Sequence, residues 1–133
     1  MTRLRCRQDP GFTLIELMIV ISMILILVSI AIPAYRQSIL HAKESVLRQN
    51  LFTLRSLISN YTLDKQKAPQ SLDDLVSAGY IKQLPNDPMT GKPDWEAVQD
   101  DSIYSPDQQE TGISDVKSSS SATSSDGTAY NTW

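Results

Sequence analysis

The chain has little of what enzymes and metal sites use: its 133 residues include one cysteine, Cys6, and one histidine, His41. A single cysteine excludes a disulfide within the chain, although small exported domains often rely on them. The sequence also lacks a phosphate-binding glycine loop and the paired spacing of zinc ligands. No nucleophile stands near a candidate base, so we predict no catalytic activity and no required cofactor.

Charge is distributed unevenly along the chain, whose formal net charge is −3. Residues 1–63 carry seven Lys and Arg against three Asp and Glu, whereas residues 64–133 carry five against twelve. An acidic carboxyl-terminal half argues against nucleic acid as a partner. It suits either a cation or basic partner, or simply a soluble surface.

An apolar run of 21 residues, Phe12 to Ile32, contains one charged residue, Glu16. As a helix this run would be about 31 Å long, which is close to the hydrocarbon thickness of a bilayer. The apolar core of a secretory signal peptide is shorter, about 7–15 residues, and a small-residue cleavage site follows it. Here Pro33 follows instead, and three arginines precede the run. The pattern predicts a single membrane span with a cytoplasmic amino terminus.

The carboxylate of Glu16 is out of place in such a span. A charge inside a membrane costs a few kcal/mol and by default indicates a functional partner. If the chain is cut after Gly11, the new amine of Phe12 is a cation near Glu16 or near the same residue of a neighbouring chain. The alternative is that Glu16 lies at the membrane interface and reaches water.

Residues 11–18, Gly-Phe-Thr-Leu-Ile-Glu-Leu-Met, resemble the processing site of type IV prepilins and of the pseudopilins of type II secretion. In that family a prepilin peptidase cleaves after the residue matching Gly11 and methylates the amine of the residue matching Phe12. The residue matching Glu16 pairs with the amine of an adjacent subunit during assembly. The family often has a glycine midway along the span, where this chain has Leu25, whereas Pro33 matches a common family proline.

Helical periodicity continues beyond the apolar run. One apolar face is formed by Leu40, Leu47, Leu51, Leu54, Ile58 and Tyr61, which follow spacings of three, four and seven. We therefore predict one helix from Phe12 to about Leu63, bent rather than ended at Pro33. Its second half must pack against the remaining chain. The predicted fold is α+β, with this helix on a small antiparallel sheet, a short helix and loops.

Four segments follow from these patterns: a cleaved basic leader (1–11), a transmembrane and assembly helix (12–33), an amphipathic helix (34–64) and a small acidic domain (65–133). In the acidic domain, Ser71 is the predicted N-cap of a short helix that Gly79 ends. The predicted strands are Trp95–Val98, Ser102–Tyr104 and Ile113–Val116. The low-complexity segment 118–125 is predicted to be a flexible or disordered loop.

A calcium site is a further implication of the resemblance, because the major pseudopilins hold Ca²⁺ in a carboxyl-terminal loop. Hard oxygen ligands on such a loop suit this ion. Asp115 and Asp126 flank the serine-rich loop and are the candidate ligands. The alternative is that both acids only cap turns.

Two features favour a pseudopilin over a type IV pilin. No cysteine remains after the leader to close the outer domain, and Gly79–Gly91 resembles a leucine-proline, aspartate-proline and glycine segment of the major, G-type pseudopilin. The resemblance implies a subunit of the bacterial inner membrane that polymerises with itself into a periplasmic pseudopilus for type II secretion. Its implied partners are prepilin peptidase, the minor pseudopilins and the inner-membrane assembly platform.

Two alternatives stay open. The chain could be a type IV pilin subunit for adhesion or motility. It could also be a monomeric module on a membrane anchor, in which the acidic domain binds an ion or an exported protein.

Overall fold

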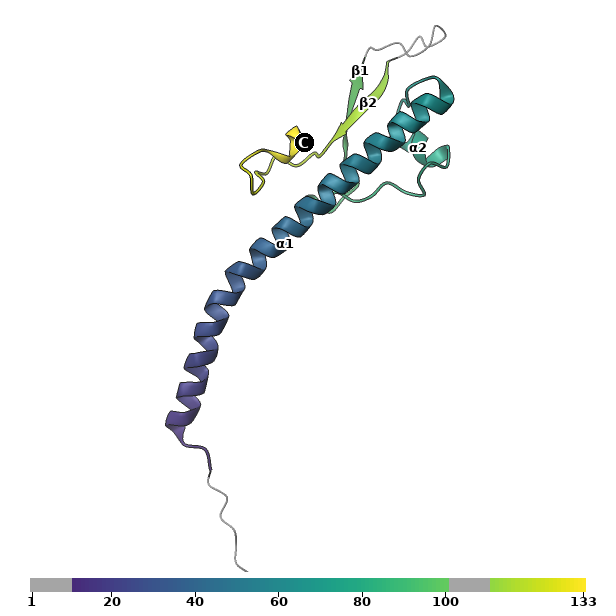
Figure 1. The fold of residues 1–133 in the computed structure, drawn as a ribbon. Coiled ribbons are helices and arrows are strands. Elements are labelled where there is room, and N and C mark those ends of the chain that lie inside the picture. The colour runs from purple at the N-terminus through teal and green to yellow at the C-terminus, as the bar shows by residue number, and fades with distance from the viewer. Residues whose placement is uncertain (1–10, 101–110) are drawn as a thin grey trace, which may run out of the picture. The chain divides into compact units, whose positions relative to one another are not determined.

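The computed structural model describes residues 11–100 and 111–133, in an α+β fold as predicted. The chain divides between Ser38 and Ile39 into two units, each described here by itself. In chain order the elements are helix α1 (Leu14–Lys65), helix α2 (Asp73–Ser77), strand β1 (Glu96–Asp100), strand β2 (Gly112–Lys117) and a 3-10 helix, η1 (Tyr130–Thr132) (Figure 1).

Helix α1 has 52 residues and confirms the predicted uninterrupted helix. Pro33 lies inside it and does not end it. At the amino-terminal end, the Thr13 carbonyl accepts the first helical hydrogen bond from the Leu17 N–H at 3.2 Å. The hydroxyls of Ser22 and Ser29 each donate to a carbonyl of the preceding turn at 2.7 Å, so the helix itself satisfies them.

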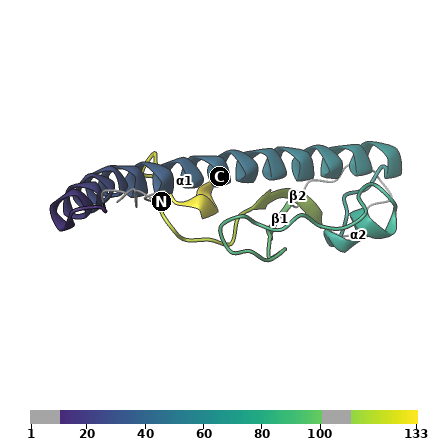
Figure 2. The same ribbon diagram turned by 90° about the horizontal axis from the view of Figure 1, so that it is seen from below.

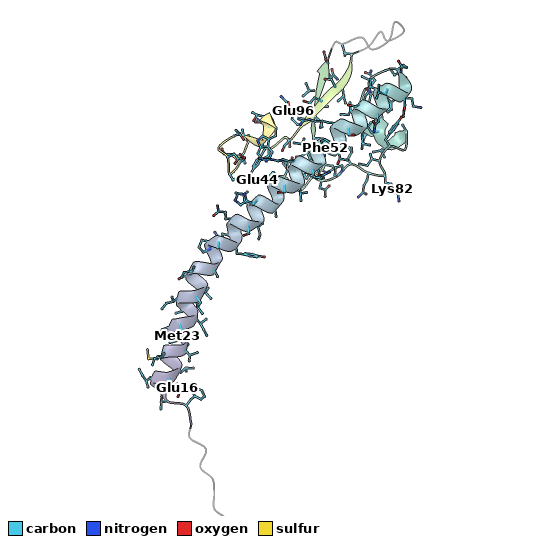
Figure 3. The ribbon with its side chains drawn as sticks, viewed as in Figure 1. Glu16, Met23, Glu44, Phe52, Lys82 and Glu96 are labelled. Atoms are coloured by element: carbon cyan, nitrogen blue, oxygen red, sulfur yellow. The ribbon has the colours of Figure 1, made fainter. Side chains whose placement is uncertain are left out.

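The first unit exposes its apolar side chains on every side of α1. An 18-residue window of this helix has a mean hydropathy of 2.9, and none of it is buried. Figure 3 labels Glu16 and Met23, whose side chains project from this part of the helix. By length and composition this part of the helix is able to cross a membrane. A helix that is apolar on all sides also needs an apolar environment.

The second unit has an ordinary hydrophobic core. The face of α1 predicted from spacing supplies Leu47, Leu51, Leu54, Ile58 and Tyr61, all of them buried. They pack against Leu72, Leu75, Trp95, Ile113, Val116 and Tyr130. Leu40, the first residue of the predicted face, is exposed instead. In Figure 2 both strands and α2 lie on one side of the carboxyl-terminal part of α1. The compact unit therefore begins at Ile39, within the segment 34–64 that is predicted as the amphipathic continuation of the helix.

The sheet of the described chain has two antiparallel strands. Val98 pairs with Asp115 and Gln99 with Ile113, so Ser114 is the extra residue of a β-bulge. The bulge lets Ile113 and Val116 both face the core although they are three residues apart. The third predicted strand segment lies in β2 as expected. The first begins at Glu96 and continues to Asp100 instead of ending at Val98, and Ser102–Tyr104 lies outside the described residues.

The predicted N-cap of the short helix is wrong. Helix α2 starts at Asp73, and the side chain of Ser71 does not cap it. The interaction runs the other way: the Asp74 carboxylate accepts hydrogen bonds from the backbone N–H groups of Gln70 and Ser71, at 2.8 and 3.0 Å. The reason is that an ionised carboxylate is a stronger acceptor than a hydroxyl. The predicted stop is confirmed, since Gly79 follows the helix with a φ of +81°.

Two residues of the serine-rich segment 118–125, which is predicted to be a flexible or disordered loop, are buried and hydrogen-bonded. Ser118 is fully buried and donates a hydrogen bond to the buried Asp87 carboxylate at 2.5 Å. Ser124 is buried as well, and its backbone N–H bonds to the Thr128 carbonyl at 2.7 Å. Composition did not reveal the burial of Ser118, because its partner Asp87 is 31 residues away in sequence.

Candidate functional site

The predicted cleavage site lies in an open position before α1. An added Cβ at Gly11 would have no atom within 4 Å, and Phe12 is 80% exposed. Neither residue belongs to a helix or strand. The peptide bond after Gly11 is thus accessible in this unit, as a processing site must be, and cleavage there stays a prediction.

Glu16 lies in the first turn of α1 and is exposed. Within residues 11–100 and 111–133, its carboxylate has no ion-pair partner. The amine predicted to pair with it would exist only after cleavage before Phe12. Any partner of the Glu16 carboxylate would therefore come from outside these residues, and the role of Glu16 in assembly stays a prediction.

Thr13 is a residue of this segment that sequence reasoning missed. Its Oγ1 accepts a hydrogen bond from the Glu16 backbone N–H at 3.3 Å, which makes Thr13 the N-cap of α1. The signal was available, because a threonine followed three residues later by a glutamate is the capping-box pattern. Thr13 fixes where the helix begins and therefore where Glu16 stands in its first turn.

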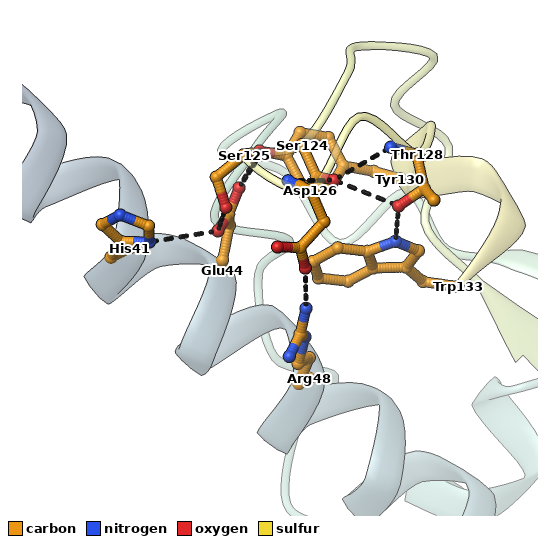
Figure 4. A network of polar contacts seen from close by, with 9 residues as sticks. All are labelled: His41, Glu44, Arg48, Ser124, Ser125, Asp126, Thr128, Tyr130 and Trp133. Atoms are coloured by element: carbon orange, nitrogen blue, oxygen red, sulfur yellow. Dashed lines mark hydrogen bonds and ion pairs between the residues drawn. The ribbon is translucent and has the colours of Figure 1, made fainter.

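A second polar site surrounds Glu44 in the other unit (Figure 4). Glu44 is on α1 and is only 5% exposed. Its carboxylate accepts hydrogen bonds from the Ser125 backbone N–H at 2.7 Å, the Ser125 hydroxyl at 2.6 Å and the Tyr130 hydroxyl at 2.9 Å. His41 Nδ1 lies 3.6 Å from the same carboxylate, while the imidazole is half exposed.

These contacts shift the pKa values of both partners. The Ser125 hydroxyl and then the Ser125 N–H lower the pKa of Glu44 from 4.5 to about 2, and they outweigh the opposing effect of burial. Burial, followed by the hydrogen bond to Glu44, raises the pKa of Tyr130 to about 12. Glu44 is therefore a buried anion and Tyr130 a fixed donor over the physiological range. Sequence reasoning did not single out Glu44. The available signal was its position, four residues after Leu40 and three before Leu47, which is the spacing of the apolar face.

Beside Glu44, Arg48 reaches the candidate ligand Asp126. The guanidinium donates to Asp126 Oδ2 at 2.8 Å, and its carbon lies 4.4 Å from the ring centre of Trp133. The Trp133 indole N–H in turn donates to the Thr128 hydroxyl at 2.8 Å. Cation–π stacking and an ion pair thus hold the Asp126 turn and Trp133 to the same arginine.

Two helical turns further along α1, Arg55 binds the other candidate ligand, Asp115. Its Nε donates to Asp115 Oδ1 at 2.5 Å, and its Nη2 donates to the main-chain oxygens of Val116 and Trp133, at 3.1 and 2.5 Å. The predicted calcium ligands are therefore each paired with an arginine. No group of three or more His, Cys, Asp or Glu side chains suited to a metal is found in the described ranges.

The comparisons with known proteins agree with this organisation. Residues 6–32 match the prokaryotic N-terminal methylation motif. The type II secretion system core protein G of Aeromonas hydrophila is 33% identical over 98 residues, covering 62% of this chain and 68% of the relative. The chain belongs to the type II secretion system core protein G family. The protein of that name from Klebsiella pneumoniae is 35% identical over 102 residues, covering 62% and 70%.

The chain is also similar to a type IV pilin. The type IV major fimbrial protein FimA of Dichelobacter nodosus is 43% identical over 62 residues, which cover 47% of this chain and 39% of FimA. No solved structure gives a significant match.

Proposed function

We propose that this chain is a pseudopilin subunit that is cleaved after Gly11, methylated at Phe12 and polymerised into a periplasmic filament for type II secretion. The observation that carries the proposal is the exposed apolar half of α1 in a chain of the core protein G family, with one acid, Glu16, that has no ion-pair partner among the described residues. Its function is structural rather than catalytic.

Membrane anchoring precedes assembly. Residues 12–33 hold the precursor in the bacterial inner membrane, with the leader cytoplasmic and the acidic domain periplasmic. Prepilin peptidase acts at Gly11, and minor pseudopilins and the inner-membrane assembly platform are the further partners. In the filament the apolar helices cover one another, and each Glu16 pairs with the amine of a neighbouring Phe12. An uncompensated carboxylate would otherwise stay in an apolar surrounding.

Substitution of Glu16 tests this mechanism. We expect Glu16→Ala and Glu16→Leu to insert into the membrane normally, because either change removes a charge from the span. Filament yield should fall at least about tenfold, since a lost ion pair away from water costs a few kcal/mol. Membrane extraction measures insertion, and filaments sheared from cells measure assembly.

Ser22→Ala is the matched control for these variants. It removes a polar group from the same span, and the Ser22 hydroxyl bonds only within its own helix. We expect normal filaments from it. Normal filaments from Glu16→Ala would refute the assembly role of Glu16.

The similarity to FimA keeps a type IV pilin as the second candidate function. Both candidates form filaments, so crosslinking gives a ladder of homo-oligomers in either case. A ladder excludes the monomeric binding module. Deletion of the chain then separates the two filament functions: loss of protein secretion supports the pseudopilin, and loss of attachment or motility supports the pilin.

A further inference from the structure

The carboxyl-terminal segment 118–133 contributes little regular structure: one isolated bridge, Thr123 to Ala129, and the short helix η1. Polar side chains of α1 reach across to this segment and to the end of β2. They are Glu44, Arg48 and Arg55, each described above with its partners. The segment is thus attached to α1 largely through these three side chains together with the packing of Tyr130.

Glu44 acts as an anion around which the segment is folded. Three donors converge on it from Ser125 and Tyr130, and none of them is adjacent to it in sequence. A buried carboxylate without such donors would be strongly unfavourable. With them, each contact is a charge-assisted hydrogen bond, the stronger kind. The donors therefore hold the serine-rich loop and η1 against α1 at one point.

The two candidate calcium ligands fit a cation poorly. Asp115 Oδ1 already accepts from Arg55 Nε and from the Val116 N–H at 2.7 Å, and Asp126 Oδ2 accepts from Arg48. Ca²⁺ needs six to eight oxygens at 2.3–2.6 Å. A cation at either carboxylate would have to displace a guanidinium or share the carboxylate with it, against charge repulsion.

The hydroxyl oxygens of Ser118 and Ser124 likewise accept hydrogen bonds from backbone N–H groups of the same segment. Ser124 Oγ accepts from the N–H groups of Asp126 and Thr128, both at 3.3 Å, and lies 3.1 Å from the Thr128 hydroxyl. Ser118 Oγ accepts from the Ser120 N–H at 3.2 Å. These oxygens face donors of the protein, so they form no ready set of ligands for a metal ion.

We propose that Glu44 fastens residues 118–133 to α1 as a buried anion, with Arg48 and Arg55 neutralising Asp126 and Asp115, so that this segment closes without calcium. The arrangement inverts the charges of a cation site. A metal ion would bind oxygen atoms of the loop, whereas here the Glu44 carboxylate accepts hydrogen bonds from donors of residues 118–133. The proposal concerns folding of the outer domain and does not depend on filament assembly.

Hydrogen exchange of the full chain in detergent micelles tests the proposal, read by mass spectrometry on peptides from residues 118–133. We expect the same exchange rates with calcium chloride and with chelator. Glu44→Gln should raise exchange in this segment by about tenfold or more, because a charged acceptor is lost. Glu96→Gln is the matched control, since it removes the same charge from an exposed position on β1. It should leave the rates unchanged.

Three results would overturn the proposal. One is calcium slowing exchange of this segment in the unmodified chain. Another is Glu44→Gln behaving like Glu96→Gln. If Glu44→Gln instead loses protection throughout the second unit, Ser125→Ala and Tyr130→Phe decide, since each removes one donor and keeps the Glu44 charge. Each should raise exchange severalfold in residues 118–133 alone, and no change in both variants is the third overturning result.

Discussion

The two units share helix α1 but differ in whether its apolar side chains are exposed or buried. Up to Ser38, helix α1 buries none of its apolar side chains, whereas beyond Ile39 it buries one face against its own chain. The helical backbone is the same in both, so the difference lies in the pattern of side chains. An all-round apolar surface requires lipid or another apolar helix, and a single apolar stripe requires a folded domain.

The two glutamates of α1 sharpen this comparison. Glu44 accepts three hydrogen bonds from its own chain, whereas Glu16 has no ion-pair partner in the described residues. Glu44 is a buried carboxylate and Glu16 lies in the apolar part of the helix, so the charge of each needs compensation. In the second unit, hydrogen bonds from the same chain compensate the charge of Glu44. For Glu16 in the first unit, we propose that the amine of a neighbouring subunit does so.

The largest expected difference in stability is between two leucine-to-alanine substitutions, one in each unit. Leu54→Ala should reduce the free energy of unfolding of the second unit by about 2–5 kcal/mol, because Leu54 is fully buried. Leu25→Ala removes the same atoms from an exposed position and should leave that free energy unchanged. Denaturant titration of the micellar protein, followed by tryptophan fluorescence, measures both. Equal losses would contradict the separation into two units.

A smaller effect is expected from added volume where β2 meets the loop after α1. A Cβ at Gly112 would lie 2.3 Å from the Cβ of Ala68, whose residue is buried. Gly112→Ala should therefore lower the free energy of unfolding by about 1–3 kcal/mol. Gly11→Ala meets no atom and should leave unfolding unchanged, while its effect on processing is read separately by mass spectrometry. A neutral result for Gly112→Ala would mean that the two segments separate easily.

The smallest effect is a pH dependence carried by Glu44. Because its pKa falls from 4.5 to about 2 on folding, its contribution to stability is complete above about pH 4.5 and is lost as the pH falls toward 2. The unmodified chain should therefore lose more stability across this window than Glu44→Gln. Asp74, whose pKa is also lowered, is present in both and cancels in the difference. Parallel curves for the two proteins would show that Glu44 does not carry this dependence.

Sequence reasoning succeeded where periodicity carries the information. Spacing alone predicted the buried leucines of α1, and Gly79 marked the end of α2. It failed at Ser71, where a nearby carboxylate competed with a hydroxyl for the same turn. Composition did not reveal that Ser118 is buried, because its partner Asp87 is 31 residues away.

The sequence by itself determined the helix, its division into an apolar and an amphipathic part, and the predicted processing motif. These are local properties, fixed by neighbours three and four residues apart. Tertiary structure alone decided that Glu44 is a buried anion, that Asp115 and Asp126 face arginines, and that a serine-rich loop is packed. The partners of Glu44, Asp115 and Asp126 are 60 to 86 residues away, and the partner of Ser118 is 31 residues away. Their partners become neighbours only when the core brings the end of the chain back onto α1.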